Sequence, residues 1–361
     1  MKLVMTLLAR DEADVVGAHV AFHLAAGVDF VIATDHRSED GTTEILEEYE
    51  RLGRLHLIRE PGEELRQRDW VTRMARLAAK EYDADWVINS DADEFWWPRG
   101  GDLKEVLRAV PARYGIAQAF VRNFVPRVED GRFFADRMVY RISPQAPLND
   151  PASPWRPTSK VAHRADPDVR VARGNHAIVA GDLQPLRGWH PIEVLHFPMR
   201  SLEQYGRKAR HQSKAFAAPG SRPGTAYHAK ANAFYAEGKG DEYFASMAVA
   251  DDELDHGLRA GTLVQDTRLR DALAVLRTDS ERDAEPTFWP ASSGASGLEF
   301  PKPSVIEDVL YAVDAAVLGE ADVQRAQRRL DELEARIARV EGRSAIGISR
   351  RFARRLTSMR H

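Results

Sequence analysis

Cysteine is absent from the 361 residues of this chain. Its absence excludes disulfide bonds, thiolate metal sites and a cysteine nucleophile, and it fits a reducing compartment such as the cytoplasm. No apolar run reaches the roughly 20 residues that a membrane-spanning helix needs. The apolar run at residues 3–9 meets Arg10-Asp11-Glu12 without a cleavage site. It therefore predicts a first strand and not a signal peptide.

Two other features are missing. Positive charge is not in excess, because the formal net charge is −4 at pH 7, and this argues against a dedicated nucleic-acid-binding protein. The chain also lacks Gly-x-Gly-x-x-Gly and Gly-x-x-x-x-Gly-Lys, the usual dinucleotide and P-loop signatures. What remains is an apolar content of 43%, enough to bury the core of one large domain or two.

The first hundred residues alternate between strand and helix patterns. Apolar runs typical of buried strands occupy residues 3–8, 30–33, 55–58 and 86–89, with helical periodicity between them. Asp11 is expected to cap the first helix and Gly27 to follow its end. This βαβαβαβ order predicts an α/β fold with a doubly wound, mostly parallel sheet and helices on both faces.

The fourth strand runs directly into Asp91-Ala92-Asp93-Glu94. Alternation along an extended chain places Asp91 and Asp93 on the same side, where two carboxylates repel each other unless a cation or proton lies between them. Oxygen ligands suit Mg²⁺ and Mn²⁺. A solvated acidic turn is the ordinary alternative, but the preceding strand and the following aromatic residues favour a metal site.

Three polar clusters, at residues 10–12, 35–42 and 91–94, stand at the carboxyl ends of predicted strands. Ligands of doubly wound sheets bind at these ends, so we expect the clusters to converge. Asp35 directly follows a strand and is a candidate nucleotide contact. For residues 40–42 an ordinary strand-to-helix loop with a capping threonine is the favoured interpretation.

These residues carry a resemblance. Segments 9–13, 26–29 and 35–42 resemble the opening of the family 2 glycosyltransferases, and Asp91-Ala92-Asp93-Glu94-Phe95 resembles the Asp-x-Asp-Glu-Phe form of a family 2-like subgroup and of family 92. The match is strong over the first hundred residues and weaker to about residue 215. Arg10-Asp11 departs from the Arg-Asn that the family often has. The resemblance implies a GT-A-like fold, a nucleoside-diphosphate-sugar donor and Mn²⁺ or Mg²⁺.

The resemblance also implies a role for individual residues. Asp35 would contact the nucleoside, Asp91 would lie near the ribose and the metal, and Asp93 would bind the metal directly. The segment around His196 resembles a stretch that supplies a further metal ligand in several such enzymes, and a structural role for His196 is equally open. The full set of candidate nucleotide-sugar-binding residues is Leu8, Arg10, Glu12, Asp35, Arg68, Asp91 and Lys160; in this set Arg68 and Lys160 would offset diphosphate charge.

The catalytic base is left open between Asp136, Glu193 and His176. The chemistry expected is transfer of the sugar to an acceptor hydroxyl, with inversion favoured by the resemblance. The acceptor is a glycan, a lipid-linked molecule or a small molecule. A nucleotidyltransferase and a non-catalytic scaffold that acts through its C-terminal helix are the alternatives.

The sequence divides into three parts. Residues 1–215 form the predicted catalytic domain, 216–302 a helical region with a loop or linker, and 303–361 a C-terminal helix with a basic tail. Leu330, Leu333, Ile337 and Val340 follow a heptad-like spacing that fits either a packing helix or a short homodimer contact. The basic tail fits either peripheral contact with the inner membrane face or an ordinary frayed terminus.

Overall fold

The computed structural model describes residues 1–143, 158–217, 226–277 and 298–307, together with residues 155, 289, 309, 311–313 and 316. Met1–Ala315 form one compact unit. The predicted heptad at 330–340, the basic tail and most of the proline-rich segment 144–157 lie outside the described residues. Among the described residues, no helix is both long and apolar enough to cross a membrane.

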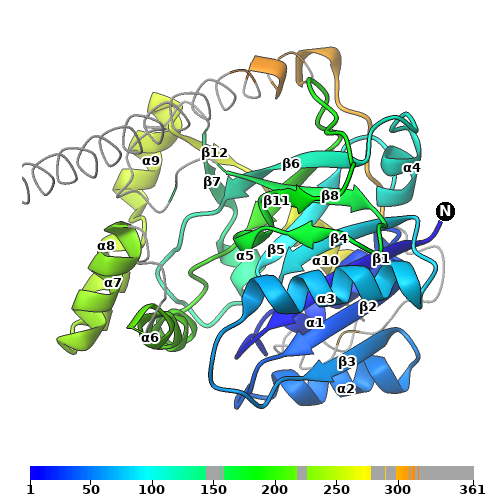
Figure 1. Cartoon of the computed structure of the whole chain (residues 1–361). Coiled ribbons are helices and arrows are strands. Elements are labelled where there is room, and N and C mark those ends of the chain that lie inside the picture. Colours follow the sequence, from blue (N-terminus) through cyan, green and yellow to red (C-terminus); the bar gives the residue numbers. More distant parts are fainter. Residues whose placement is uncertain are drawn as a thin grey trace, which may run out of the picture. The chain divides into compact units, whose positions relative to one another are not determined.

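An eight-stranded mixed sheet forms the centre of this unit (Figure 1), with strand order β3-β2-β1-β4-β8-β6-β11-β5. Its strands are β1 (Leu3–Ala9), β2 (Phe30–Asp35), β3 (Leu55–Arg59), β4 (Trp86–Asp91), β5 (Glu94–Pro98), β6 (Ile116–Asn123), β8 (Ser159–Arg164) and β11 (Ile192–His196). The pairs β3/β2, β2/β1, β1/β4 and β6/β11 are parallel. The pairs β4/β8, β8/β6 and β11/β5 are antiparallel. The predicted mostly parallel α/β fold of GT-A type is therefore confirmed.

Helices cover both faces of the sheet. The helices of the described residues are α1 (Val16–Ala25), α2 (Thr42–Arg51), α3 (Gln67–Lys80), α4 (Leu103–Arg108), α5 (Phe134–Arg137), α6 (Leu202–Ala217), α7 (Ala226–Ala236), α8 (Gly240–Met247), α9 (Asp251–Ala260) and α10 (Arg268–Leu276). Leu3, Met5 and Leu7 of β1 join the core that includes α1, α2, α4 and α10. Val4 points to the other face, where it joins a smaller core with α3. Alternation along a strand buried on both faces explains the continuous apolar run at 3–9.

The remaining short elements are β7 (Tyr140–Ile142), which pairs with β12 (Leu263–Gln265), β9 (Arg170–Val171), which pairs with β10 (Ile178–Ala180), and the 3₁₀ turn η1 (Arg173–Asn175). Helices α6, α7 and α8 share a separate apolar cluster that includes Tyr205 and Tyr243. Helix α10 instead packs Leu269 and Leu273 into the main core. The division at residues 215 and 302 stays a prediction.

Local expectations were met unevenly. Gly27 lies just beyond α1 with a φ of 109°, as predicted. Asp11 does not cap α1, because the helix begins at Val16 and Asp11 has a φ of 55° in the preceding loop. The alternating pattern of residues 132–142 predicts a strand. This prediction is wrong over the first part of the segment, where Phe133 and Phe134 enter the core and α5 forms instead.

The register of the sheet aligns the strand ends that carry the polar clusters. Leu8 of β1 lies opposite Asp91 of β4, and Ala9 lies opposite Asp35 of β2. At the far side, His196 of β11 lies between Asn123 of β6 and Glu94 of β5. The expected convergence of the three clusters at one edge of the sheet is therefore present.

Candidate active site

The buried hydroxyl group of Ser90 stabilises the turn between β4 and β5. Ser90 Oγ donates toward the carbonyl oxygens of Asp91 and Glu94 at 3.1 and 3.2 Å. Trp96 Nε1 donates a hydrogen bond to Ser90 Oγ at 3.2 Å, and His19 Nε2 lies 3.1 Å from Ser90 Oγ. The carboxylates at 91–94 therefore stand on a rigid turn and not on a free loop.

Helix α1 supplies a second support through two buried histidines. The backbone N–H of Trp96, on the edge strand β5, donates to His23 Nε2 at 2.9 Å. His23 Nδ1 must then carry the proton, which it donates to the carbonyl oxygen of His19 at 2.7 Å. Burial lowers the pKa of His23, and it lowers the pKa of His19 to about 3. Both rings are therefore neutral at pH 7 and act as fixed hydrogen-bonding groups.

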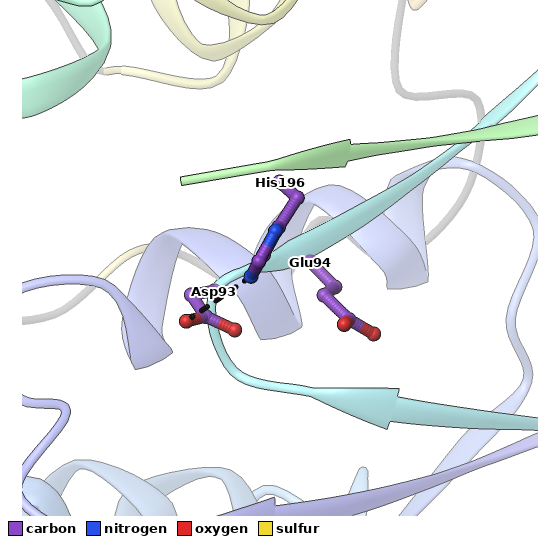
Figure 2. Close-up of side chains that lie close together, drawn as sticks. All are labelled: Asp93, Glu94 and His196. Atoms are coloured by element: carbon purple, nitrogen blue, oxygen red, sulfur yellow. Dashed lines mark ion pairs between the residues drawn. The ribbon is translucent and has the colours of Figure 1, made fainter. Parts of the chain in front are cut away.

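Asp93, Glu94 and His196 form the one candidate metal-binding group among the described residues (Figure 2), with ligand atoms within 4.8 Å of one another. His196 Nε2 lies 3.6 Å from Asp93 Oδ2. His196 Nδ1 is 2.7 Å from Asn123 Oδ1, an acceptor, so this nitrogen carries the proton. The lone pair of Nε2 then points toward Asp93. Fixing one ring nitrogen by a hydrogen bond is how proteins orient a metal-binding histidine.

Asp91 and Glu94 share a buried lysine. Lys160 Nζ lies 2.9 Å from Asp91 Oδ2 and 2.6 Å from Glu94 Oε1. Burial lowers the pKa of Lys160, but the two carboxylates outweigh it and raise the pKa above its usual value. Burial raises the pKa of Glu94 to about 8, with Lys160 opposing and Asp91 adding to the shift. At pH 7 Glu94 is therefore mainly protonated, and the ammonium group of Lys160 balances the carboxylate of Asp91.

Asp93 has a second cation from α6. Lys208 Nζ lies 2.5 Å from Asp93 Oδ2. Burial opposes ionisation of Asp93, but nearby cations, Lys208 foremost, outweigh it and hold the pKa of Asp93 well below the usual range. Asp93 is therefore an anion and can act as a ligand.

Glu12 borders this group from the β1–α1 loop. Its carboxylate pairs with Arg200, which also binds Asp14 at 2.7 Å. Burial raises the pKa of Glu12 to about 7, against the pull of Arg200 and Lys208. Arg200 is itself buried and donates to the carbonyl oxygen of Phe197 at 3.0 Å. It therefore ties the loop before α1 to the chain that follows His196.

Helix α6 lies across the strand ends and presents three nitrogen-bearing side chains to three loops. Besides Lys208, it presents Arg207, 3.5 Å from Asp40, and His211, 2.8 Å from Asp11. Residues three and four apart lie on one face of a helix, so one side of α6 meets carboxylates that follow β1, β2 and β4. The amphipathic pattern of this helix did not reveal these pairings.

Asp35 is buried and organises its own loop. Ser38 Oγ donates to Oδ1 at 2.5 Å and Thr43 Oγ1 donates to Oδ2 at 2.6 Å. Asp40 holds Thr42 through its backbone N–H and hydroxyl, at 3.1 and 2.6 Å. The structural interpretation of residues 40–42 fits these contacts. Asp35 Oδ1 also accepts a hydrogen bond from the backbone N–H of Ser38 at 3.3 Å, whereas Oδ2 has one lone pair left. The nucleotide contact of Asp35 stays a prediction.

Three side-chain nitrogen groups surround the carboxylate of Asp91. Besides Lys160, Gln67 Nε2 and Asn175 Nδ2 lie 3.5 and 3.4 Å from its Oδ1. Asn175 is fully buried and has a φ of 60°, and Gly174 before it has a φ of 75°. Two left-handed residues in succession bring the Asn175 amide to Asp91, whereas the exposed His176 turns away and its Nδ1 lies 2.8 Å from the carbonyl oxygen of Ser159.

The other candidate bases differ in their surroundings. Glu193 is buried and lies 2.6 Å from Arg122 and 2.7 Å from Arg268. Burial raises its pKa, but the arginines outweigh burial and hold it far below the usual range. Asp136 contacts Arg277 at 3.2 Å and its side chain is 30% exposed. The structure therefore leaves Asp136 more open to an acceptor than Glu193.

The remaining predicted donor contacts are spread along the edge. Arg10 Nη1 lies 3.4 Å from His36 Nδ1, and the His36 ring packs against Trp70. Leu8 lies beside Asp91 in the sheet register. Arg68 is set apart: its side chain is 61% exposed, lies 3.5 Å from Asp69 and lines a groove along α3.

Sequence reasoning missed Asn123, Asn175, Lys208 and Arg200. Asn123 had a usable signal, because the pattern of residues 116–125 is typical of a strand. Asn175 directly precedes His176, one of the candidate bases. Lys208 belongs to a basic helix face that could border an anionic donor, but arginine and lysine are frequent in this chain. The partners of Lys208 and Arg200 lie far away in sequence.

The sequence model of glycosyltransferase family 92 matches residues 6–167. Staphylococcus aureus TarS (residues 1–349), crystallised with UDP, shares 11% identity at a TM-score of 0.30, over 76% of this chain and 90% of that one. Glucosyl-3-phosphoglycerate synthase from Mycobacterium tuberculosis, crystallised with Mn²⁺, UDP and glucosyl-3-phosphoglycerate, shares 16% at 0.25, over 45% and 57%. At these TM-scores the likeness carries no argument. No curated protein matches the chain.

The fold and the family match define the class, and the chain is a glycosyltransferase. The sequence model that it matches, over residues 6–167, is that of glycosyltransferase family 92. The resemblance predicted from the first hundred residues is thereby confirmed, and the matched segment includes Asp35, Asp91 and Asp93.

Proposed function

We propose that the protein transfers a sugar from a nucleoside diphosphate to an acceptor hydroxyl and uses Mn²⁺ or Mg²⁺ to do so. The observation that carries the metal part is the pairing of Asp93 with His196, whose Nε2 is aimed by Asn123. The carboxylate and imidazole donors fit a divalent cation. Asp93, His196 and the neighbouring Asp91 are the residues that would hold it. When bound, such an ion stabilises the negative charge of the departing nucleoside diphosphate.

The chain's own residues have separate tasks in this proposal. Asp35 and Arg10 bind the nucleoside end of the donor, and Asp91 reaches the ribose. Lys160 keeps Asp91 in place through its 2.9 Å contact. Lys208, which lies 2.5 Å from Asp93, offers a point charge to the diphosphate.

Deprotonation of the acceptor needs a base that the acceptor can reach. Glu193 has both carboxylate oxygens paired with arginines, which leaves no strong acceptor for a proton at neutral pH. Asp136, with one arginine contact and partial exposure, meets the requirement better. We therefore propose Asp136 over Glu193 and His176, and inversion at the anomeric carbon.

The chain's location and assembly also belong to the proposal. We propose a cytoplasmic protein, on the ground that it has no cysteine. Contact with the inner membrane face, or a homodimer through the segment after residue 303, are the two roles proposed for the C-terminal part.

The test combines metal binding with donor turnover. Purified full-length protein is titrated with Mn²⁺, and a panel of nucleoside diphosphates is screened by thermal shift with and without the metal, since a ligand of the folded state raises its stability. We expect Mn²⁺ to strengthen binding of one nucleoside diphosphate and to support hydrolysis of the matching sugar donor. The exposed Glu64→Gln variant is the control for Asp93→Asn. Equal hydrolysis by both variants would contradict the proposal.

A further inference from the structure

A groove runs between helix α3 and the segment that leads into β9, on the face of the sheet that α3 covers. Its volume is about 680 Å³. The lining residues are Arg68, Asp69, Thr72, Arg73, Arg76, Leu77, Lys80 and Arg170. Five of these side chains are cationic and one is anionic. In a chain with a net charge of −4, this is a local reversal of charge.

The two walls of the groove are fixed to each other. Arg76 Nε donates to the carbonyl oxygen of Val169 at 2.8 Å, and its Nη2 donates to that of Asp168 at 3.1 Å. Thr72 Oγ1 accepts a hydrogen bond from the backbone N–H of Val171 at 3.1 Å. The hollow is therefore formed by paired elements and not by two loose surfaces.

The charge of the groove is only partly compensated. Arg73 has a close acidic partner, Glu60 at 2.5 Å, and Arg68 has Asp69 at 3.5 Å. Lys80 and Arg170 are exposed and have no acidic partner within salt-bridge distance in the described part of the chain. Guanidinium groups bind phosphate and carboxylate groups through paired hydrogen bonds. An anion in this groove could therefore accept hydrogen bonds from the exposed side chains of Lys80 and Arg170.

The length of the groove limits the kind of anion. Helix α3 rises about 1.5 Å per residue, so its cationic residues from Arg68 to Lys80 span roughly 18 Å. A single phosphate or a diphosphate covers only part of this distance. The Arg68 end adjoins Gln67, whose amide lies 3.5 Å from Asp91, so a ligand along the groove ends beside the candidate active site.

We propose that the groove between α3 and β9 binds an extended anionic ligand that carries phosphate or carboxylate groups repeated along its length. Its position next to Asp91 makes this ligand the acceptor, and that second statement rests on the proposed function. The groove itself is independent of transfer, because none of Arg73, Lys80 and Arg170 contacts Asp93 or His196.

The experiment measures binding of a short-chain linear polyphosphate to the full-length protein by calorimetry, with inorganic phosphate as the single-anion probe. We expect the polymer to bind and inorganic phosphate to compete poorly at equal phosphate concentration. The double variant Lys80→Glu/Arg170→Glu should weaken polymer binding roughly tenfold or more. Affinity should fall as salt rises, because exposed charges are screened.

Arg108→Glu/Arg113→Glu is the matched control, because it makes the same change in net charge at exposed residues outside the groove. This control should leave polymer binding nearly unchanged. Equal losses in both double variants, or equally strong binding of inorganic phosphate, would overturn the proposal. Thermal shift with nucleoside diphosphates and Mn²⁺ is measured on the same proteins. If the polymer binds and no nucleotide does, the groove stands and the proposed function fails; the reverse result rejects the groove alone.

Discussion

Strand β11 carries two polar side chains three residues apart that meet opposite surroundings. Glu193 is saturated: both carboxylate oxygens are paired with arginines, and the side chain is 6% exposed. His196 lies at the strand end with a side chain that is 23% exposed, one nitrogen fixed by Asn123 and the other facing Asp93. An odd separation along a strand puts the two on opposite faces. The comparison separates a polar group that completes the fold from one that is oriented for a ligand.

The largest effect is expected from removal of Asp93, the carboxylate that faces His196. Asp93→Ala deletes an anionic ligand, so we expect Mn²⁺ binding to be lost and sugar transfer to fall on the order of a thousandfold, corresponding to several kcal/mol of lost charge stabilisation. The circular dichroism spectrum should be retained. Metal titration and initial rates measure the effect. Near-normal transfer at limiting Mn²⁺ would rule out Asp93 as a ligand.

Glu193→Gln should lower the free energy of unfolding and leave metal binding unchanged. The change leaves two arginines near a buried neutral group, and breaking a buried ion pair from one side costs about 3 to 5 kcal/mol of unfolding free energy. Denaturant unfolding measures this loss. The Mn²⁺ dissociation constant should stay as in the wild type, which distinguishes this variant from Asp93→Ala. A stable Glu193→Gln protein without activity would instead return Glu193 to the catalytic candidates.

An effect of intermediate size is expected at Asn123, because it hydrogen-bonds to His196 and is not itself a candidate metal ligand. Asn123→Ala frees the His196 ring to rotate and change tautomer, and loss of such a supporting contact weakens metal binding by about 10- to 100-fold. Asn123→Asp keeps an acceptor oxygen and should restore most of the affinity. If both variants bind Mn²⁺ as tightly as the wild type, His196 is structural.

The smallest expected effect concerns a histidine that is buried without a ligand role. Burial lowers the pKa of His163 on β8 to about 4, from an ordinary value of 6.5. The unfolded chain therefore binds the proton more readily than the folded one, and stability falls as pH drops from about 6.5 toward 4. At pH 5 the loss is about 2 kcal/mol relative to pH 7. His163→Gln should reduce the pH 7 to pH 5 difference by that amount, measured by denaturant unfolding.

The first hundred residues were predictable because their signals are local. Apolar runs and Gly27 fix strands and turns within a few residues, and the carboxyl ends of parallel strands must share one edge. The position of Asp35, Asp91 and Asp93 at this edge was predictable for that reason. His196 was left open because its role depends on Asn123, which lies 73 residues earlier in the chain.

What escaped prediction depends on tertiary contacts. Residues 132–142 alternate well enough for a strand, but packing of Phe133 and Phe134 into the core overrides that pattern. The pairing of Lys208 with Asp93 joins residues 115 apart, and no periodicity in α6 marks which lysine turns inward. Glu193 was indistinguishable from a catalytic acid because its arginine partners come from β6 and from Arg268 at the start of α10.

Three side chains of α6, two cationic and one imidazole, affect how a metal-binding affinity at Asp93 is interpreted. Arg207, Lys208 and His211 already face Asp40, Asp93 and Asp11. A divalent ion at Asp93 would therefore replace an ammonium group at the carboxylate and would not enter a site of uncompensated negative charge. Metal binding would be an exchange of counter-ions, with a free energy equal to the difference between two interactions. The displaced Lys208 ammonium group would then be available to the phosphates of the proposed donor.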